Sequence, residues 1–274
     1  MSQKLIIIGK RSNLSQAIYN ALPSSVLIST KDVLSNMDVF SQYKKSRFLI
    51  IFNNFQRSTK LSDLNDPTSY INNSILSTAI ILSKLTNYKV DKIIYTSSAS
   101  VYGDNNYCKE SDILQPSSLP ASLKVSNENL VSEFCKSNDI DYTIARIFNM
   151  YGGIDNFSVI SKIISAVKDK NELSLINNGS AIRDYIHIQD VVSMYIKILE
   201  EINMPVVNIA SGNGISVRSI LDFLANKGIK IKAKDLNRNE IKVSTACVEQ
   251  NKRTLGDNKT LINVEEYILS KVKN

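Results

Sequence analysis

Short, continuous apolar runs alternate with amphipathic segments through the first half of the chain. Five runs have the length and apolar content of strands buried on both faces: 4–9, 25–29, 47–54, 91–98 and 141–149. Between them, apolar residues recur at helical spacing over 14–22, 69–87 and 120–137. Strands that alternate with helices predict right-handed βαβ crossovers. We therefore expect an α/β fold with a Rossmann-type doubly wound parallel sheet.

After residue 150 the pattern changes. Helical periodicity returns over 156–170, 185–202, 216–227 and 261–274, with short strands predicted at 172–177 and 206–210. No internal repeat, low-complexity tract or Pro/Gly linker separates the two halves. We therefore expect any second domain to be interleaved with the first.

The loop after the first apolar run carries a reduced glycine pattern. It reads G-x-x-S-x-x-S, with Gly9, Ser12 and Ser15 at the fixed positions. In a Rossmann unit such glycines let the backbone turn tightly and approach a pyrophosphate at a helix N-terminus. Only one of three glycines remains, so an ordinary strand-to-helix turn with a serine cap explains the loop as well.

The second predicted strand ends in Ser29, Thr30 and Lys31, without the acidic residue that holds the ribose hydroxyls of NAD. Lys31, Lys10 and Arg11 together offer positive charge for a 2′-phosphate. The pattern favours NADP, with NAD as the alternative cofactor. A solvated surface cluster is the other interpretation of these three cations.

Composition limits the class of partner. The chain has 274 residues, a net charge of +7 and a pI near 9.1, which suits a polyanion as well as a small anionic ligand. The lysines are scattered, however, and no stripe of arginines and aromatic residues accompanies them. A nucleic-acid-binding function would rest on charge alone, and we expect no nucleic-acid partner.

Cysteine and histidine are sparse. Cys108, Cys135 and Cys247 form no C-x-x-C pair, which is typical of reduced thiols in the cytoplasm. His187 is the only histidine, so we expect no metal site built from histidines and no Ser-His-Asp triad elsewhere.

No segment approaches the roughly 20 apolar residues of a membrane span, and the first apolar run is too short for a signal peptide. We expect a cytoplasmic protein with no membrane partner.

Several blocks in order carry a resemblance to a known family. They are DKIIYTSSASVYGD (91–104), TIARIFNMYGG (143–153), the stretch 156–192 that contains RDYIHIQDVV, and VVNIASGNGISVRSILDFL (206–224). Together they resemble the extended short-chain dehydrogenase/reductases, the NAD-dependent epimerase/dehydratase family that acts on nucleotide-sugars. The resemblance implies an NAD(P)-binding Rossmann domain over 1–150 and 185–212. It also implies a small, interleaved substrate-binding subdomain over 151–184 and 213–274.

The resemblance assigns roles to four residues. Ser98 matches the hydroxyl that binds the reacting sugar oxygen, and Lys124 matches the lysine that binds the nicotinamide ribose and lowers a tyrosine pKa. Asn149 and Arg183 match residues that contact the sugar or its diphosphate. Two simpler interpretations stay open: Ser98 as a hydroxyl that satisfies the strand end, and Lys124 as a surface lysine paired with Glu128 at i+4.

Further residues are expected to contact the cofactor or to serve the fold. The expected cofactor contacts are Gly9, Lys10, Arg11, Ser12, Asn13, Leu14, Lys31, Asn53 and Lys124. For Asp184 and His187 we expect structural roles, with His187 packed and satisfied rather than catalytic.

The sequence departs from the family at its proton donor. The family has a tyrosine four residues before the lysine, one helical turn away, and here that position is Pro120. Proline suits a first helical turn, so the helix should survive without the donor. Tyr88 stands four residues before Lys92, but that pair lies at the end of the preceding helix, ahead of the strand IIYTSS, and is not expected to form the site.

The loop after Ser98 contains three residues that could replace the tyrosine, namely Tyr107, Cys108 and Glu110, although an ordinary surface loop explains them too. Ser77 replaces a further glycine of the family. Ser98 is followed by Ala-Ser instead of the Asp-Glu of the family's 4,6-dehydratases, which argues against a dehydratase.

Two hypotheses of function follow. The first is an NAD(P)-dependent nucleotide-sugar oxidoreductase or epimerase. The alternative is a catalytically degenerate member that binds a dinucleotide or nucleotide-sugar as a regulator or partner subunit. The family often dimerises through the helices at 69–87 and around Lys124, so a homodimer is plausible, although Ile75, Ile80, Leu130 and Phe134 fit core packing equally well.

Overall fold

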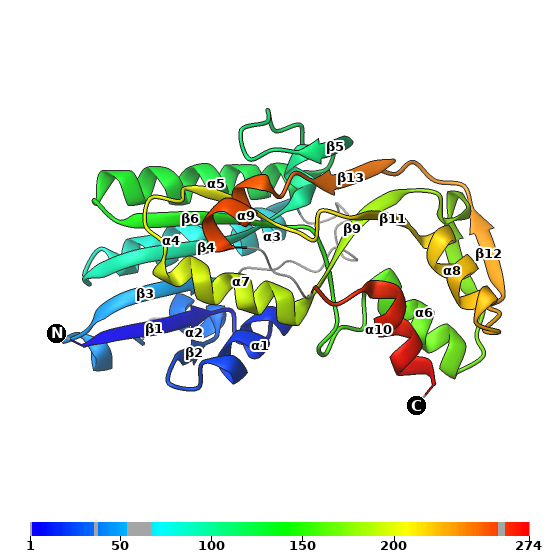
Figure 1. The fold of residues 1–274 in the computed structure, drawn as a ribbon. Coiled ribbons are helices and arrows are strands. Elements are labelled where there is room, and N and C mark those ends of the chain that lie inside the picture. Colours follow the sequence, from blue (N-terminus) through cyan, green and yellow to red (C-terminus); the bar gives the residue numbers. More distant parts are fainter. Residues whose placement is uncertain (1, 36–37, 54–66, 257–260, 274) are drawn as a thin grey trace.

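The computed structural model describes residues 2–35, 38–53, 67–256 and 261–273. Its centre is a parallel six-stranded sheet with the order β2-β1-β3-β4-β6-β10 (Figure 1). The strands are β1 (Gln3–Ile8), β2 (Val26–Ile28), β3 (Arg47–Phe52), β4 (Val90–Ser98), β6 (Asp141–Ile147) and β10 (Val206–Ile209). The predicted fold class is therefore confirmed.

Helices cover both faces of this sheet, because successive strand residues point to opposite sides. Ile7, Ile51 and Ile94 pack on one face, against α1 (Asn13–Ala21) and α7 (Ile188–Glu200). Ile6 and Ile93 pack on the other. The helices over that second face are α2 (Thr30–Leu34), α4 (Ser77–Leu85) and α5 (Leu119–Ser137). The near-continuous isoleucine runs of the sequence are thus strands buried on both sides.

One half of the sheet is narrow. In the described part of the segment between β2 and β3, the chain forms α2 and a 3-10 turn at Ser41–Tyr43. Strand β2 is the outermost strand on that side. The commonest Rossmann order, 3-2-1-4-5-6, places a further strand there. The half of the sheet next to the first loop is therefore one strand narrower than that order.

The long helix predicted over 69–87 is interrupted. The chain forms α3 (Pro67–Ile71), one π-helical turn (Asn72–Leu76) and then α4. The hydroxyls of Ser77 and Thr78 donate to the carbonyl of Ser74 at 3.0 and 2.9 Å. The side chain of Asn127 in α5 donates to the hydroxyl of Ser74 at 2.8 Å. Such side-chain bonds to a helix carbonyl widen the helix locally.

A smaller layer of helices lies beyond the carboxyl ends of the parallel strands (Figure 1). It contains α6 (Val159–Lys168), α8 (Val217–Asn226), α10 (Val264–Val272) and the parallel pair β8 (Leu173–Ile176) and β12 (Ala233–Leu236). Ile160, Ile163, Ile220 and Ile268 form its separate core. Serines or an asparagine cap all three helices.

A second sheet joins the two layers. Its order is β11-β9-β13-β5, and β7 also pairs with β9. The strands are β5 (Asn105–Cys108), β7 (Asn149–Tyr151), β9 (Ile182–His187), β11 (Gly214–Ser216) and β13 (Val243–Ala246), and α9 (Glu249–Leu255) follows β13. Both predicted domains contribute to this sheet, because β5 lies within 1–150 and β13 within 213–274. Across the described ranges, no helix has the length and apolar character needed to cross a membrane.

Candidate functional site

The first loop lies at the point where the strand order reverses, between β1 and β3. The amides of Gly9 and Lys10 donate to the carbonyl of Ile28 at 2.9 and 3.1 Å, which ties the loop to the end of β2. Gly9 has a φ of 113°, and a Cβ there would stand 2.1 Å from the carbonyl oxygen of Asn53. The glycine that remains is therefore the one that the packing of the loop requires.

The two serines of the loop have structural partners. Ser12 caps α1, because its hydroxyl accepts from the amide of Ser15 at 3.3 Å. The Ser15 hydroxyl is buried and accepts from the Asn53 amide at 2.9 Å. Asn53 in turn accepts from Thr96, whose hydroxyl lies 2.6 Å from that of Tyr195. The serines replace glycines without leaving unsatisfied polar groups at these contacts.

Other expected cofactor residues also serve the protein itself. The Asn13 side chain donates to the carbonyl of Gly152 at 2.8 Å and accepts from the amide of Ile154 at 3.0 Å, so it joins α1 to the loop after β7. Leu14 is fully buried in the core under α7, and Asn53 is 2% exposed. Cofactor contacts by these residues remain a prediction.

Three cations surround the end of β2. Lys10, Arg11 and Lys31 are all exposed. Ser29 caps α2 by accepting from the amide of Asp32 at 3.0 Å, which places Lys31 in the first turn after β2. Because the first loop is bonded to the same strand end, the three charges lie around one end of β2.

Ser98 ends β4 and caps the 3-10 turn Ala99–Tyr102. Its hydroxyl oxygen accepts from the backbone amide of Ser100 at 3.2 Å and from the hydroxyl of Ser100 at 3.0 Å. Both serines are partly exposed. Because these two contacts use the oxygen as an acceptor, the Ser98 hydroxyl proton is available to a further acceptor.

Helix α5 keeps its register despite the proline. Ser118 caps it, and Pro120 lies in its first turn, where no intrahelical amide donor is needed. Lys124 points to β4: its ammonium donates to the carbonyl of Thr96 at 3.0 Å and to the hydroxyl of Tyr95 at 3.4 Å. Burial lowers the Lys124 pKa to about 8.

Tyr95 is thus the tyrosine that meets Lys124, but it comes from the sheet instead of the helix. Its side chain is fully buried. Burial, and then the nearby carboxylate of Glu128, raise its pKa well above the ordinary value. Tyr95 therefore stays protonated at neutral pH and does not take the place of the exposed family tyrosine.

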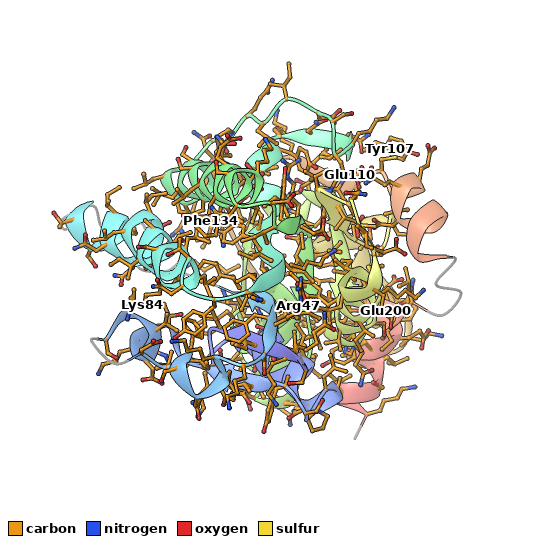
Figure 2. The ribbon with its side chains drawn as sticks, turned by 90° about the vertical axis from the view of Figure 1, so that its left-hand side faces the viewer. Arg47, Lys84, Tyr107, Glu110, Phe134 and Glu200 are labelled. Atoms are coloured by element: carbon orange, nitrogen blue, oxygen red, sulfur yellow. The ribbon has the colours of Figure 1, made fainter. Side chains whose placement is uncertain are left out.

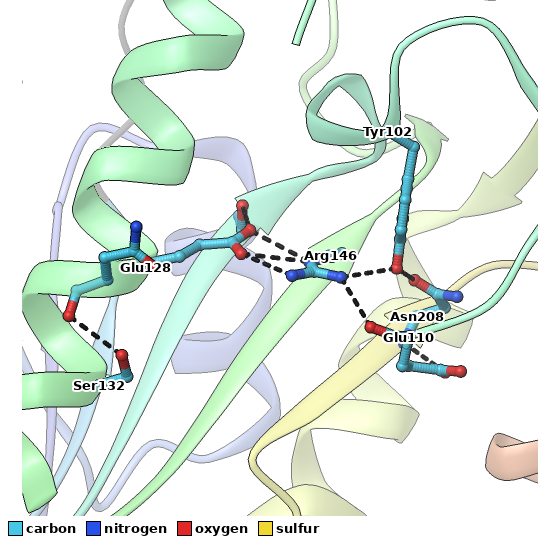
Figure 3. Close-up of polar contacts among 8 residues, drawn as sticks. Tyr102, Glu110, Glu128, Ser132, Arg146 and Asn208 are labelled. Carbon is cyan, nitrogen blue, oxygen red and sulfur yellow. Dashed lines mark hydrogen bonds and ion pairs between the residues drawn. The ribbon is translucent and has the colours of Figure 1, made fainter. Parts of the chain in front are cut away.

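Glu128 lies four residues after Lys124 and is 4% exposed. Its carboxylate accepts from Arg146 Nε at 3.2 Å, from Arg146 Nη2 at 2.8 Å and from the hydroxyl of Ser97 (Figure 3). The interpretation of Lys124 and Glu128 as a surface pair is therefore wrong. The helical spacing was read correctly, but this face of α5 packs on the sheet and is not solvated.

The Arg146 network extends beyond Glu128. Arg146 Nη1 donates to the Tyr102 hydroxyl at 2.9 Å and to the Glu110 carbonyl at 3.2 Å (Figure 3). Tyr102 donates to the Asn208 side chain at 2.7 Å, and the Glu110 carboxylate accepts from the Asn208 amide at 3.0 Å. One buried cation thus connects α5, β6, β10 and the loop after β4.

The three candidates for replacing the family's tyrosine have contacts away from Ser98. Tyr107 is half exposed next to α9, where its hydroxyl donates to Glu249 at 3.1 Å (Figure 2). Cys108 is fully buried, and burial raises its pKa to about 12. Glu110 belongs to the Arg146 network. The described contacts connect none of the three with Ser98.

The substrate-side residues lie on β7 and β9. Asn149 donates to the carbonyl of Asp184 at 3.2 Å. Arg183 pairs with Glu240 at 3.3 Å, in the segment before β13. Asp184 is fully buried and accepts from the amide and the hydroxyl of Ser211 at 2.8 and 2.7 Å, so its role is structural, as expected.

Two more arginines, Arg218 and Arg238, contact the turn before β9, and neither was among the predicted site residues. Arg218 donates to the carbonyl of Asn178 at 3.2 Å. The carbonyl of Arg238 accepts from the Asn177 side chain at 2.6 Å. Both therefore meet the turn Asn177–Gly179, just before β9. They come from segments far apart in the sequence, so no local motif marks them.

His187 is a packed residue. Its ring lies 5.2 Å from that of Tyr151 and 4.9 Å from that of Tyr267, and its Nδ1 accepts from the amide of Gln189 at 3.2 Å. Burial lowers its pKa to about 4, so it is neutral at physiological pH. This confirms the expectation of a satisfied histidine.

The alternative Tyr88 and Lys92 pair is also structural. Tyr88 stacks on Phe48 at 5.2 Å and donates to Asp38. Lys92 is 3% exposed and pairs with Asp141 at 2.9 Å. The two side chains have separate partners and form no common site.

A cavity of about 630 Å³ lies in the smaller layer, between α6, β8 and α10. Lys162, Lys168, Tyr267 and Lys271 are among its lining residues. None of Ser98, Lys124, Asn149 and Arg183 lines it. Within the described ranges, no three His, Cys, Asp or Glu side chains form a group that could hold a metal ion. All three cysteines are free and buried.

Residues 6–210 match the model of the NAD dependent epimerase/dehydratase family. The probable UDP-arabinose 4-epimerase 3 of Arabidopsis thaliana is 24% identical over an alignment of 200 residues. The match covers 63% of this chain and 49% of that protein. The UDP-glucuronate 4-epimerase of Thermodesulfobacterium geofontis is 24% identical over an alignment of 202 residues. That match covers 71% of this chain and 62% of that protein. The chain thus spans about half to three fifths of the length of these curated relatives.

A solved structure shares the fold over its whole length. The UDP-glucuronic acid 4-epimerase of Bacillus cereus, in a mutant form with NAD and UDP-4-deoxy-4-fluoro-glucuronic acid, superimposes with a TM-score of 0.87 and 20% identity. The match covers 98% of each chain. At 20% identity, this structural similarity establishes the fold alone.

Proposed function

Because the chain belongs to the NAD dependent epimerase/dehydratase family, we propose that it moves a hydride between an NAD(P) cofactor and a carbon of a nucleotide-sugar, as an epimerase or ketoreductase. The observation that carries the proposal is the placement of Lys124. Helix α5 brings its ammonium to β4, two residues from Ser98, although the tyrosine of the family is replaced by Pro120.

The described residues fit a dinucleotide at the carboxyl ends of the strands. Gly9 allows the tight first turn, and exposed Lys10 and Arg11 follow it. Lys124 supplies a cation on the other side of β3. The cofactor would accept or return the hydride. The protein would bind the sugar oxygen through Ser98, and the sugar or its diphosphate through Arg183 and Asn149.

The cofactor preference is the finer part of the proposal. Solved relatives hold NAD, among them the Bacillus cereus enzyme. In this chain no carboxylate occupies the end of β2, and Ser29 there caps a helix. The exposed cations Lys10, Arg11 and Lys31 favour a ligand with a 2′-phosphate. We therefore propose NADP ahead of NAD.

The charge reversal Lys31→Glu tests this preference. We expect the wild-type protein to bind NADPH more tightly than NADH, and Lys31→Glu to weaken NADPH binding by about 10-fold or more, because a charge-assisted bond to phosphate is replaced by repulsion. NADH binding should change little. Fluorescence titration measures both Kd values. The control is Lys89→Glu, which makes the same charge change at an exposed position before β4. Equal effects on NADPH and NADH would contradict the preference.

The activity itself is tested with purified protein. We expect incubation with NAD⁺ or NADP⁺ and a UDP-sugar, either UDP-glucose or UDP-glucuronic acid, to produce enzyme-bound reduced cofactor or the 4-epimer. Absorbance of the reduced nicotinamide and chromatography of the sugar measure the two outcomes. Binding without either product would contradict the proposal.

That outcome would favour the second candidate, a member that binds a dinucleotide or nucleotide-sugar without turnover. Pro120 is the observation in its favour, since none of Tyr107, Cys108 and Glu110 contacts Ser98 among the described contacts.

A homodimer and a cytoplasmic location stay predictions. Leu130 and Phe134 pack against the protein's own core, while Ile71 and Leu76 are each 45% exposed.

A further inference from the structure

The end of β4 carries a pair of serines that the proposed chemistry uses only in part. The hydroxyl of Ser100 donates to the hydroxyl oxygen of Ser98 at 3.0 Å, and the amide of Ser100 donates to the same oxygen at 3.2 Å. Both side chains are partly exposed, whereas Ala99 between them is buried. The two hydroxyls therefore form a short hydrogen-bonded chain at the accessible carboxyl end of β4.

We propose that Ser100 relays the proton that the family's tyrosine would carry, so that the proton passes between solvent and the sugar oxygen through Ser100 and Ser98. The inference rests on the proposed function. Ser98 is the group that touches the sugar. Ser100 acts through Ser98 and is a positioning and relay residue.

The two tyrosine hydroxyls near this strand end are unsuited to the task. Tyr95 is fully buried beneath Lys124, and its raised pKa keeps its proton in place. Tyr102 is 1% exposed and its hydroxyl is bound between Arg146 and Asn208. Helix α5 presents Pro120 in place of a phenol. Ser98 and Ser100, in contrast, contact each other and are both partly exposed to solvent.

The relay is balanced in both directions. In reduction, a hydride supplied by the bound cofactor would reach the carbonyl carbon of the sugar, and the carbonyl oxygen would take the Ser98 proton. Ser98 would then take the proton of Ser100, and Ser100 would take one from a hydronium ion of the solvent, so one solvent proton is consumed for each hydride. In oxidation each transfer is reversed, and the sugar hydroxyl loses its proton to Ser98.

Two donors aimed at one oxygen make such a transfer easier. Negative charge that develops on the Ser98 oxygen is stabilised by the amide and the hydroxyl of Ser100, which are already in place. Removal of one preorganised donor of this kind reduces rates by about 100-fold to 1,000-fold in enzymes. Ser100→Ala removes the hydroxyl donor and keeps the amide.

The test compares Ser100→Ala, Ser100→Thr and the control Ser132→Ala, whose hydroxyl donates only to a carbonyl of its own helix, that of Asn129, at 3.0 Å. The probe is UDP-glucose or UDP-glucuronic acid, whichever the wild-type protein oxidises. We expect Ser100→Ala to reduce the rate of cofactor reduction by about 100-fold. Ser100→Thr, which keeps a hydroxyl, should retain most of the rate, and Ser132→Ala all of it.

Two further readouts separate a relay from a structural role. Calorimetry should give unchanged Kd values for the cofactor and the UDP-sugar in Ser100→Ala. Rates in mixtures of H₂O and D₂O should report more than one moving proton in the wild-type protein, and fewer in Ser100→Ala.

The outcomes distinguish this inference from the proposed function. An active wild-type protein in which Ser100→Ala keeps its rate would overturn the relay and leave the proposed function standing. A rate lost together with ligand binding would also overturn the relay, in favour of a structural role for Ser100. A wild-type protein that binds UDP-sugars without oxidising them would overturn both.

Discussion

Replacing Lys124 with methionine is expected to reduce the rate of hydride transfer by about 100-fold or more, because it removes a fixed positive charge from a partly water-excluded site. The ammonium lies against β4, bonded to the carbonyl of Thr96 and the hydroxyl of Tyr95. Methionine keeps the length and the apolar part of the side chain. The measurement is the rate of cofactor reduction at saturating UDP-sugar.

The pH dependence should identify the charge as the cause. Burial lowers the Lys124 pKa to about 8, so the cation is present below that pH and is lost as pH rises through it. The wild-type rate should therefore fall above about pH 8, and Lys124→Met should lack this ionisation. An unchanged rate or an unchanged pH profile would contradict a role for the cation.

A matched control comes from the same helix. Lys136 of α5 is exposed and pairs with Glu133 on the surface. Lys136→Met should leave the rate unchanged. Lys124→Met should not lower the unfolding temperature, because folding disfavours the charged form of this lysine. A loss of rate together with a loss of stability would indicate a folding defect instead.

The register around Lys124 shows what the sequence alone could predict. The spacing of Pro120 and Lys124 placed both on one helix, and α5 begins at Leu119 with the proline in its first turn. The short apolar runs likewise predicted the strands of the parallel sheet. These features depend on local composition and periodicity, which a sequence shows directly.

Contacts between segments that are far apart in the sequence could not be predicted from local composition and periodicity. Glu128 was interpretable only as a neighbour of Lys124 at i+4, because nothing local shows that its partner is Arg146 on β6. Strands β5 and β13 are short and lack an apolar run, so they depend on pairing within the second sheet, where β5 pairs with β13 and β13 also pairs with β9. The burial of Ser15 against Asn53, 38 residues away, was equally hidden.

The function of the loop serines illustrates the same limit. From the sequence, Ser12 and Ser15 leave one glycine of three in the first loop, which weakens the dinucleotide-binding pattern. In the structure Ser12 caps α1, and Ser15 accepts a buried hydrogen bond from Asn53. The substitutions are therefore compensated by the fold, and they no longer argue against a working site. Pro120 is the departure that still does.

The largest loss of stability is expected from Arg146→Met. This change leaves the carboxylate of Glu128 buried with the hydroxyl of Ser97 but without its cation. Removing one partner of a buried pair costs about 3–5 kcal/mol, because the remaining charge stays desolvated. We expect the unfolding temperature to fall by about 10 °C. Thermal and urea unfolding followed by circular dichroism measure the change.

Two further variants test the cause. Arg47 and Asp91 form a comparable ion pair on the surface, with the arginine side chain 53% exposed, so Arg47→Ala should cost under about 1 kcal/mol. The double variant Arg146→Met with Glu128→Leu should recover part of the stability, since it removes the unpaired charge. An Arg146→Met variant that is no less stable than Arg47→Ala would show that water reaches Glu128.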